Sequence, residues 1–559
     1  MPATWWPKSV TALRGYTVRQ FLADLQAGLV VGVVAIPLAL AFAIASGVPP
    51  DRGLVTAAVA GFLISLLGGS RVQIGGPTGA FVVIIYGIVQ KHGLDGLVVC
   101  TVLAGFILVA LGLARFGGAI KFIPYPVVTG FTSGIALIIF SSQVKDLLGL
   151  RMGPVPTGFL EKWQAFGLHA GTASPPALAV SGFALAILIF WPKVSRRIPG
   201  PIVAILLATV GAALLHLPVE TIGSRFGEIH AGIPSPHFPV LTTERLRELF
   251  PSAVTVALLA AIESLLSAVV ADGMIGTRHK SNVELVGQGI ANIASGLFGG
   301  IPATGAIART ATNIKNGGRT PVAGMVHAVT VFLVLVFLGK WARYIPLAAL
   351  ASVLVVVAYH MSEWRSFATL IRAPRSDVAV LLITFLLTVM VDLTVAVQVG
   401  VVLAAFLFMK RMADVTNVGM ITSELVDAPD GTMNSDAGGV ARRRIPEGVE
   451  VYEVNGPFFF GAADKIRDVL GVTAKKPRVF ILRMRNVPAM DASGMRVLDD
   501  LHDSFTKHGI RFLIAGIHAQ PLVALDRAGR LERYGPETFV ADLDEALARA
   551  RQILEAAPA

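Results

Sequence analysis

Two interruptions of apolar sequence carry the residue types best suited to binding a ligand. Residues 75–81 are GGPTGAF and residues 299–307 are GGIPATGAI, and both contain Thr-Gly-Ala followed by an apolar residue. A helix that begins inside a membrane exposes unpaired backbone N–H groups and the positive end of its dipole. Two such helix starts that face one another can bind an anion, and interrupted helices in the two halves of a transporter mark its substrate site. We therefore predict an anion site here; the alternative is ordinary loops, or glycines that allow close helix packing.

Side chains near the two interruptions extend this predicted site. The hydroxyl groups of Thr78 and Thr304 are placed to cap the new helices or to contact a ligand. Phe42, on the opening helix, is a candidate for an apolar wall, and Gln73 lies just before the first interruption. Packing alone also explains an aromatic residue in a membrane helix.

Glu263 is an acidic residue at apparent membrane depth, because it interrupts the apolar run 252–270. An isolated carboxylate there costs at least ~2.5 kcal/mol, so it normally faces a cavity or a partner. Neutralising it with a proton removes its repulsion of an incoming anion, which would couple anion entry to proton entry. Ser267 lies one turn further along the same helix face. The alternative is a buried glutamate that bonds to backbone and has no role in transport.

Arg309 is the second charge at membrane depth, five residues after Thr304 and within the first two turns of the second predicted helix. Its guanidinium group would add positive potential to an anion cavity. Two alternatives are that it only neutralises Glu263, or that it extends to a membrane interface.

The composition places these residues in a membrane protein. The chain has 559 residues, of which 54% are hydrophobic and only 15% are charged, against roughly 25% charged in an average soluble domain. Apolar runs recur up to residue 409, and we count about fourteen segments, some too short to span a bilayer alone. With the N-terminus inside, most lysines and arginines fall on the inner side, so we expect both termini in the cytoplasm.

Several other classes of protein are excluded or unsupported. The net charge of +11 comes from the apolar part and not from a nucleic-acid-binding segment, and the single cysteine, Cys100, permits no internal disulfide. The chain has no Walker A loop and no hydrolase or zinc-protease motif. We therefore predict neither an enzyme nor a pump driven by ATP, and no cofactor, metal or nucleic-acid partner.

The sequence divides into four parts. Residues 1–20 are expected to form a cytoplasmic lead-in, 21–411 the membrane domain, 412–444 a polar linker and 445–559 a cytoplasmic domain. In the last part, strands near 449–454, 479–482 and 511–515 alternate with helices near 462–470 and 493–505, which favours a small α/β domain with a partly parallel sheet.

Residues 490–494 join a strand to a helix in this last part. Ser493 is available there for regulatory phosphorylation at a helix N-terminus. Capping of the helix by Asp491 or Ser493 is the simpler explanation.

These motifs together resemble those of a bacterial sulfate permease (SulP) family transporter with a C-terminal STAS domain. The resemblance rests on 28–50 (including IPLALAFA), 68–78 (GGSRVQIGGPT), 261–267 (AIESLLS) and the DASG turn at 491–494, and it covers nearly the whole chain. The stretch from Glu263 to residue 289 is similar to the enterobacterial C4-dicarboxylate transporters of this family.

The resemblance implies a fold of seven plus seven helices in an inverted repeat. Segments 1–4 and 8–11 would form a core domain that moves like an elevator against a gate domain of segments 5–7 and 12–14. It also implies a homodimer in the bacterial inner membrane. By position, the resemblance implies that Phe42, Thr78 and the residues from Ala306 to Arg309 belong to the anion site and that Glu263 is the cation-coupling residue. Together with the interruptions, the predicted substrate-binding residues are Phe42, Gln73, Thr78, Gly79, Thr304, Gly305, Ala306, Ala308 and Arg309, and the predicted cation-coupling residues are Glu263 and Ser267.

From the resemblance we expect import of a C4-dicarboxylate, such as succinate, fumarate or aspartate, together with protons. A sodium-dependent bicarbonate transporter of the family carries Asp at the position of Glu263, so glutamate favours protons over sodium. The alternatives are a bicarbonate or sulfate transporter on the same scaffold, coupled to protons or sodium, and a channel-like anion conductor. A further alternative is a membrane sensor whose STAS domain signals to a cytoplasmic protein partner.

Overall fold

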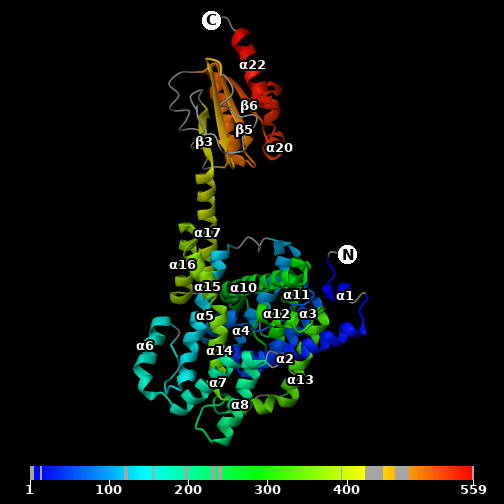
Figure 1. The fold of residues 1–559 in the computed structure, drawn as a ribbon, viewed down its shortest axis with the longest axis vertical. Coiled ribbons are helices and arrows are strands. Elements are labelled where there is room, and N and C mark those ends of the chain that lie inside the picture. Colours follow the sequence, from blue (N-terminus) through cyan, green and yellow to red (C-terminus); the bar gives the residue numbers. More distant parts are fainter. Residues whose placement is uncertain are drawn as a thin grey trace. The chain divides into compact units, whose positions relative to one another are not determined.

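The computed structural model divides into two compact units, residues Met1–Ala404 and Ala405–Ala559 (Figure 1). It describes residues 5–12, 15–118, 124–153, 155–156, 158–195, 199–227, 232, 235–236, 239, 242–391, 393–421, 445–459 and 477–556. We describe each unit by itself.

The first half of the membrane unit contains one repeat of helices. Its elements are α1 (Lys8–Ala12), α2 (Val18–Ala45), α3 (Pro50–Leu67), β1 (Gly75–Gly76), the 3-10 turn η2 (Gly79–Phe81), α4 (Val82–Leu113), α5 (Tyr125–Leu148), α6 (Phe159–His169), α7 (Pro175–Val194) and α8 (Gly200–Leu214). Gly93 interrupts α4 with a φ of 67°, which a glycine adopts readily, so α4 consists of two successive helices. This half therefore supplies seven membrane segments: α2, α3, the two parts of α4, α5, α7 and α8.

The second half repeats this order. Its elements are α9 (Ile222–Phe226), α10 (Thr243–Ile275), α11 (Ser281–Leu297), β2 (Thr304–Gly305), α12 (Ile307–Lys315), α13 (Pro321–Leu338), α14 (Leu347–Met361), α15 (Trp364–Leu370), α16 (Arg375–Met390) and α17 (Leu393–Val415). Among the described residues, eight helices are long and apolar enough to cross a membrane by length and composition. Together with the shorter ones, the two halves give the predicted fourteen segments.

The contacts between helices show the inverted repeat. The short strands β1 and β2, one from each half, pair antiparallel. The packing of α3 on α13 is matched by that of α11 on α4, and the packing of α2 on α13 by that of α10 on α4. A second group forms where α5 packs on α14 and α16, and α7 on α8 and α14. These two groups are the expected core and gate, and the predicted fold class is confirmed.

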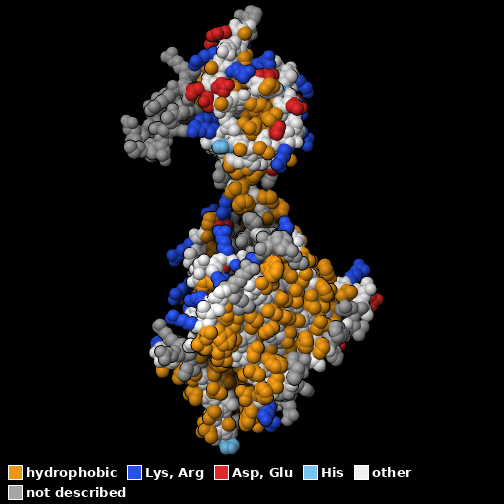
Figure 2. Space-filling view, turned by 90° about the vertical axis from the view of Figure 1, so that its right-hand side faces the viewer, with side chains coloured by type: hydrophobic (Ala, Val, Ile, Leu, Met, Phe, Trp, Pro, Cys, Tyr) orange, Lys and Arg blue, Asp and Glu red, His pale blue; other side chains and the backbone are white. Residues whose placement is uncertain are grey.

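The membrane unit also has the surface of a bilayer protein. Figure 2 shows hydrophobic side chains over much of its visible face. Large apolar side chains are exposed on several helices, for example Phe106 and Phe183, which are 58% and 50% exposed. Such a surface is stable against lipid and not against water.

The second unit contains a five-stranded sheet with helices on both faces. Its strands, in the order β3-β4-β5-β6-β7, are Asn417–Ile421, Val449–Asn455, Val479–Asn486, Arg511–Ala515 and Phe539–Val540. Only β3 is antiparallel to its neighbour. Side chains alternate between two cores, one under α19 (Ala492–Lys507) and α20 (Ala519–Arg527) and one under α22 (Leu543–Ala556); α21 (Arg530–Tyr534) follows α20.

Two expectations for this unit differ from the structure or lie outside it. Strand β3 falls within residues 412–444, the predicted linker, so that range also contributes an edge strand of the sheet. Prediction from composition misses such a strand because its partner, β4, is almost thirty residues away. The helix expected near 462–470 lies outside the described residues.

Candidate functional site

Two helices begin side by side where the sequence is interrupted. Gly75 pairs with Gly305 and Gly76 with Thr304, and the N–H of Ala306 donates to the carbonyl oxygen of Ile74 at 2.8 Å. Turn η2 follows β1 and leads into α4, and α12 follows β2. The two-strand pairing satisfies backbone groups that would otherwise be unpaired at this depth. It also holds both helix starts next to one another, as the prediction of an anion site requires.

Glu263 is connected to the first helix start. It is half-buried on α10, and the Thr78 hydroxyl donates to its Oε2 at 2.8 Å. Thr78 is the N-cap residue of η2, but its side chain accepts no capping hydrogen bond. The predicted alternative of capping by Thr78 is therefore wrong, because the hydroxyl group is directed to the carboxyl group instead.

Arg309 reaches from the second helix start to the first. It lies in the first turn of α12, its side chain is only 3% exposed, and its Nη2 donates to the carbonyl oxygen of Pro77. Its Nη1 is buried and has no hydrogen-bond partner among the described residues. The burial excludes the alternative that Arg309 extends to a membrane interface.

Glycine at position 76 makes this arrangement possible. A methyl group there would lie 2.6 Å from Nη1 of Arg309, and the φ of Gly76 is 149°. Arg309 and Glu263 form no ion pair within 4.0 Å in the part of the chain that the structure describes, although the two charges lie close enough to interact electrostatically. An unpaired N–H of a buried guanidinium group is a strong donor for an anion.

The side chain of Thr304 has a structural partner. It is fully buried, and its hydroxyl group donates to the carbonyl oxygen of Ala260 on α10 at 2.9 Å. This bond anchors β2 to α10. The Thr304 hydroxyl group therefore has a hydrogen-bond partner within the protein. It does not cap α12, whose N-cap residue is Ala306.

Gln73 and Ser267 also connect elements of the scaffold. Gln73 donates through Nε2 to both the carbonyl and hydroxyl oxygens of Ser264 at 3.1 Å, and its side chain passes directly over Gly305. Ser267 is fully buried and donates to the Thr310 hydroxyl oxygen at 3.2 Å. Both side chains hold α10 against the two interruptions.

Phe42 and Gly79 lie where the core meets the gate. A methyl group at Gly79 would be 3.3 Å from the Phe42 ring, 3.2 Å from Ile139 of α5 and 2.8 Å from the sulfur of Met361 of α14. Ala306 is 8% exposed, whereas Ala308 on the first turn of α12 is exposed. The first helix start thus faces the gate through Gly79.

The sequence analysis missed Glu284, a buried carboxylate of α11. Its Oε2 accepts from the N–H groups of Gly69 and Ser70 at 2.7 and 3.0 Å, and its Oε1 accepts from Ser264 and Gln288 at 3.1 and 3.0 Å. Four donors stabilise this charge and fix the loop before β1. The available signal was an acidic residue directly before a predicted membrane segment.

Asn292 is a second residue that was missed. Its side chain accepts from the N–H of Ala303 and donates to the carbonyl oxygen of Ala303, both at 2.9 Å. An asparagine side chain can hold a backbone unit on both sides in this way, because it has a donor and an acceptor. It fixes the second interruption as Glu284 fixes the approach to the first.

The regulatory candidate Ser493 lies at the start of α19. Asp491 is the N-cap residue of this helix, and its Oδ1 accepts from the N–H of Gly494 at 2.9 Å. Capping by Asp491 is therefore confirmed. Ser493 is half-buried, and its phosphorylation stays a prediction.

The described residues contain no group of three or more His, Cys, Asp or Glu side chains that could hold a metal ion. The groups that the two helix starts bring together are hydrogen-bond donors, one guanidinium group and one carboxyl group.

Comparison with known proteins identifies the family of this chain. The model of the sulfate permease family matches residues 21–384, and the STAS domain model matches residues 441–546. A putative sulfate transporter of Bacillus subtilis, YvdB, is 44% identical, covering 95% of this chain and 98% of its own. The bicarbonate transporter BicA of Picosynechococcus is 30% identical, covering 95% of each chain.

Solved structures show the same fold. The murine Solute Carrier 26 family member A9 anion transporter, in its inward-facing state, has a TM-score of 0.86 at 19% identity and covers 98% of this chain and 94% of its own. The transmembrane domain of a cyanobacterial BicA has a TM-score of 0.62 at 32% identity and covers 70% of this chain and 98% of its own.

The named relatives are transporters of sulfate, bicarbonate or anions, and none of these names is that of a C4-dicarboxylate transporter. The predicted substrate is therefore unsupported, and the alternatives of sulfate and bicarbonate agree better with the relatives. The whole-chain matches, the paired helix starts and the buried arginine lead to one conclusion: this chain is a multi-pass membrane protein of the sulfate permease family of anion transporters, with a C-terminal STAS domain.

Proposed function

We propose that the protein is a secondary transporter that takes up a small inorganic oxyanion, sulfate or bicarbonate, together with a cation. The observation that supports this most directly is Arg309, whose buried Nη1 has no partner among the described residues. A buried N–H of a charged group that lacks an acceptor is costly, and an anion between the two helix starts would supply the acceptor that Nη1 lacks.

Glu263 is the proposed coupling residue. It is held by Thr78 at the first helix start and has no direct ion pair with Arg309 among the described residues. A carboxylate in the same site repels the transported anion. A proton or a sodium ion bound at Glu263 removes this repulsion, so that anion and cation enter together and leave together.

Movement of the core against the gate would then carry the site across the membrane. Gly79, beside Phe42, Ile139 and Met361, is the point where the first helix start meets the gate. The lack of a side chain at Gly79 allows the two surfaces to slide with little obstruction. The homodimer, the cytoplasmic termini, the inner-membrane location and a protein partner for the STAS domain belong to the same proposal.

The test is uptake by the purified protein in proteoliposomes. Labelled sulfate and bicarbonate are offered with an imposed proton or sodium gradient, and unlabelled succinate is the competitor. We expect saturable, gradient-driven uptake of at least one of the two oxyanions, with no competition by succinate. Uptake of succinate itself would restore the dicarboxylate alternative, and conductance that does not saturate would indicate a channel.

Glu263→Gln tests the coupling separately. The variant should lose gradient-driven accumulation and retain exchange of labelled for unlabelled anion. The glutamine still accepts the hydrogen bond from Thr78, but it carries no charge for a proton or sodium ion to neutralise. Accumulation at the wild-type level in this variant would contradict the role of Glu263.

A further inference from the structure

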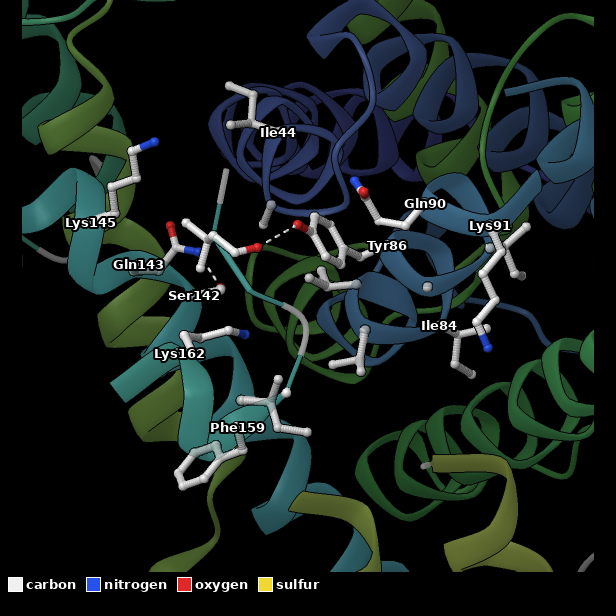
Figure 3. A pocket seen from close by; sticks show the side chains of 18 of the residues that line it. Ile44, Ile84, Tyr86, Gln90, Lys91, Ser142, Gln143, Lys145, Phe159 and Lys162 are labelled. Atoms are coloured by element: carbon white, nitrogen blue, oxygen red, sulfur yellow. Dashed lines mark hydrogen bonds between the residues drawn. The ribbon is translucent and has the colours of Figure 1, made fainter. Parts of the chain in front are cut away.

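A cavity of about 620 Å³ lies between the core and the gate, and its lining on α4 begins at Val82, the first residue of that helix. Figure 3 shows its lining side chains, which come from the end of α2, the first part of α4 (residues 82–92), the end of α5, and α6, with others from α9, α10 and α16. Ile44, near the end of α2, lines the cavity, whereas α2 begins at Val18. Because α2 is long enough to cross the membrane, the cavity lies on the opposite side of the membrane from the start of α2. We call this cavity the vestibule.

The charges of the vestibule are predominantly positive. Lys91, Lys145, Lys162 and Arg225 line it, together with one carboxylate, Asp146. Asp146 bonds to Arg225, with N–O distances of 2.7 and 3.0 Å, and the same guanidinium group also bonds to Glu220, so this cluster carries one negative charge against the three lysines. The three lysines therefore determine the potential in the cavity, and low-dielectric walls strengthen such a potential.

His92 also lines the vestibule and lies 3.7 Å from Glu248, whose side chain is largely exposed. Lys145 donates through Nζ to the carbonyl oxygens of Met152 and Gly153, both at 3.1 Å. Bonds to neutral carbonyl groups orient this lysine and leave its charge in place.

Lys162 is the unexplained residue of the vestibule. Its side chain extends from α6 and is only 7% exposed, and it has no hydrogen bond or ion pair with any described residue. In Figure 3 it points from α6 toward the interior of the cavity. The side-chain stem is buried, whereas its Nζ keeps some accessible surface and opens into the cavity, so the charge can meet a ligand there.

Burial lowers the pKa of the Lys162 ammonium group, so a negative ligand beside it would stabilise the charged form. Two neutral polar groups lie on α5 in the same cavity. The Gln143 amide donates through Nε2 to the Ser142 hydroxyl oxygen at 2.7 Å, which leaves its second N–H available.

We infer that the vestibule is a second anion-binding site, in which Lys162 holds a small oxyanion before it reaches the site at Arg309. The two sites have different linings: Val82 lines the vestibule, whereas Thr78, Gly79 and Arg309 do not. The role in transport depends on the proposed function, but the binding of an anion in the vestibule does not.

A cysteine reporter tests the binding without transport. The chain has one native cysteine, Cys100, which is buried, so Gln90→Cys places a reactive thiol on α4 at the vestibule. In purified protein, the rate of its modification by an anionic methanethiosulfonate reagent is divided by the rate with a cationic one. Sulfate is then added as the probe.

We expect this ratio to fall about threefold or more when Lys162→Met is added, since the positive potential decreases. Lys162→Arg should preserve the ratio, and sulfate should slow the anionic reagent only where the charge at position 162 is kept. Leu168→Cys is the matched control reporter. Leu168 is exposed on α6, the helix of Lys162, but lies outside the vestibule, so the ratio measured there should change neither with Lys162→Met nor with sulfate. An unchanged ratio in Lys162→Met, or no effect of sulfate, would overturn the inference.

Transport provides the second readout. Lys162→Met should raise the KM for the transported anion about threefold or more and leave the maximal rate unchanged, while Lys193→Gln, on α7 and outside the vestibule, should change neither. A loss of maximal rate with an unchanged KM would contradict a recruiting role. If the wild-type protein transports no tested anion, the proposed function fails, and the reporter assay still decides on the vestibule.

Discussion

The two interrupted segments have matching backbones and different side-chain roles. Each contributes a short strand to one antiparallel pair, and each leads into a helix start. In the first segment, the Thr78 hydroxyl bonds to the Glu263 carboxyl group. In the second, the equivalent Thr304 bonds to backbone, and the charged group is Arg309.

This difference shows how an inverted repeat can divide a function. The paired backbones position two helix N-termini, which favour an anion whichever half they come from. Both charged groups come from the second half, Glu263 from α10 and Arg309 from α12, but the first segment contacts Glu263 through the Thr78 hydroxyl group. The site is therefore symmetric in its backbone dipoles and asymmetric in its chemistry, and variants of the two segments should have different effects.

The largest effect is expected from Arg309→Gln. Removing a buried charge that pairs with the transported anion typically costs about 2–5 kcal/mol, so kcat/KM for anion uptake should fall by about 100-fold or more. Arg309→Lys, which keeps the charge and shortens the reach, should be intermediate. Uptake by Arg309→Gln at the wild-type level would show that the second segment does not supply the charge.

Gly76→Ala tests whether the first segment makes room for the arginine of the second. The added methyl group would lie 2.6 Å from Nη1 of Arg309 at a φ of 149°, so the guanidinium group must move. We expect a loss of uptake of about tenfold, from a misplacement equivalent to about 1.4 kcal/mol, together with lower stability. Gly182→Ala on α7, where a methyl group meets nothing within 4 Å, is the control and should keep full activity.

Thr78→Val tests the link between the first segment and Glu263. The variant keeps the shape of the side chain and removes the donor to Oε2. Gradient-driven accumulation of the anion should fall severalfold, while exchange is largely retained, because the coupling carboxyl group loses its fixed position. Thr78→Ser should restore accumulation; equal losses of exchange and accumulation would instead indicate that Thr78 binds the anion.

Much of this site was predictable from local sequence. The two glycine- and proline-containing segments, Glu263 and Arg309 are each exceptions to a uniformly apolar background, and an exception at membrane depth needs a physical reason. The fold class followed from the same apolar runs and from the resemblance. No local pattern, however, shows which way a side chain points.

The residues that could not be placed depend on contacts between distant segments. Gln73 is predicted to bind the anion, and the sequence could not show that its Nε2 bonds to Ser264, almost two hundred residues away. Glu284 was overlooked because three of its four donors, Gly69, Ser70 and Ser264, come from distant segments, and only Gln288 lies on the same helix. Strand β3 was assigned to a linker for the same reason, since its partner β4 follows only after a long polar stretch.

Thr304→Val should have the smallest effect and is the strictest test of the comparison. The variant loses one buried hydrogen bond to the Ala260 carbonyl, which costs about 1 kcal/mol of stability, and the modification rate of the buried Cys100 during heating measures this loss. The KM for the anion and the coupling should stay at wild-type values, because the hydroxyl group is already used by the scaffold. If Thr304→Val impaired accumulation as strongly as Thr78→Val, the two threonines would be equivalent. The division of roles between the segments would then be wrong, since the repeat would be symmetric in its side chains as well as in its backbone.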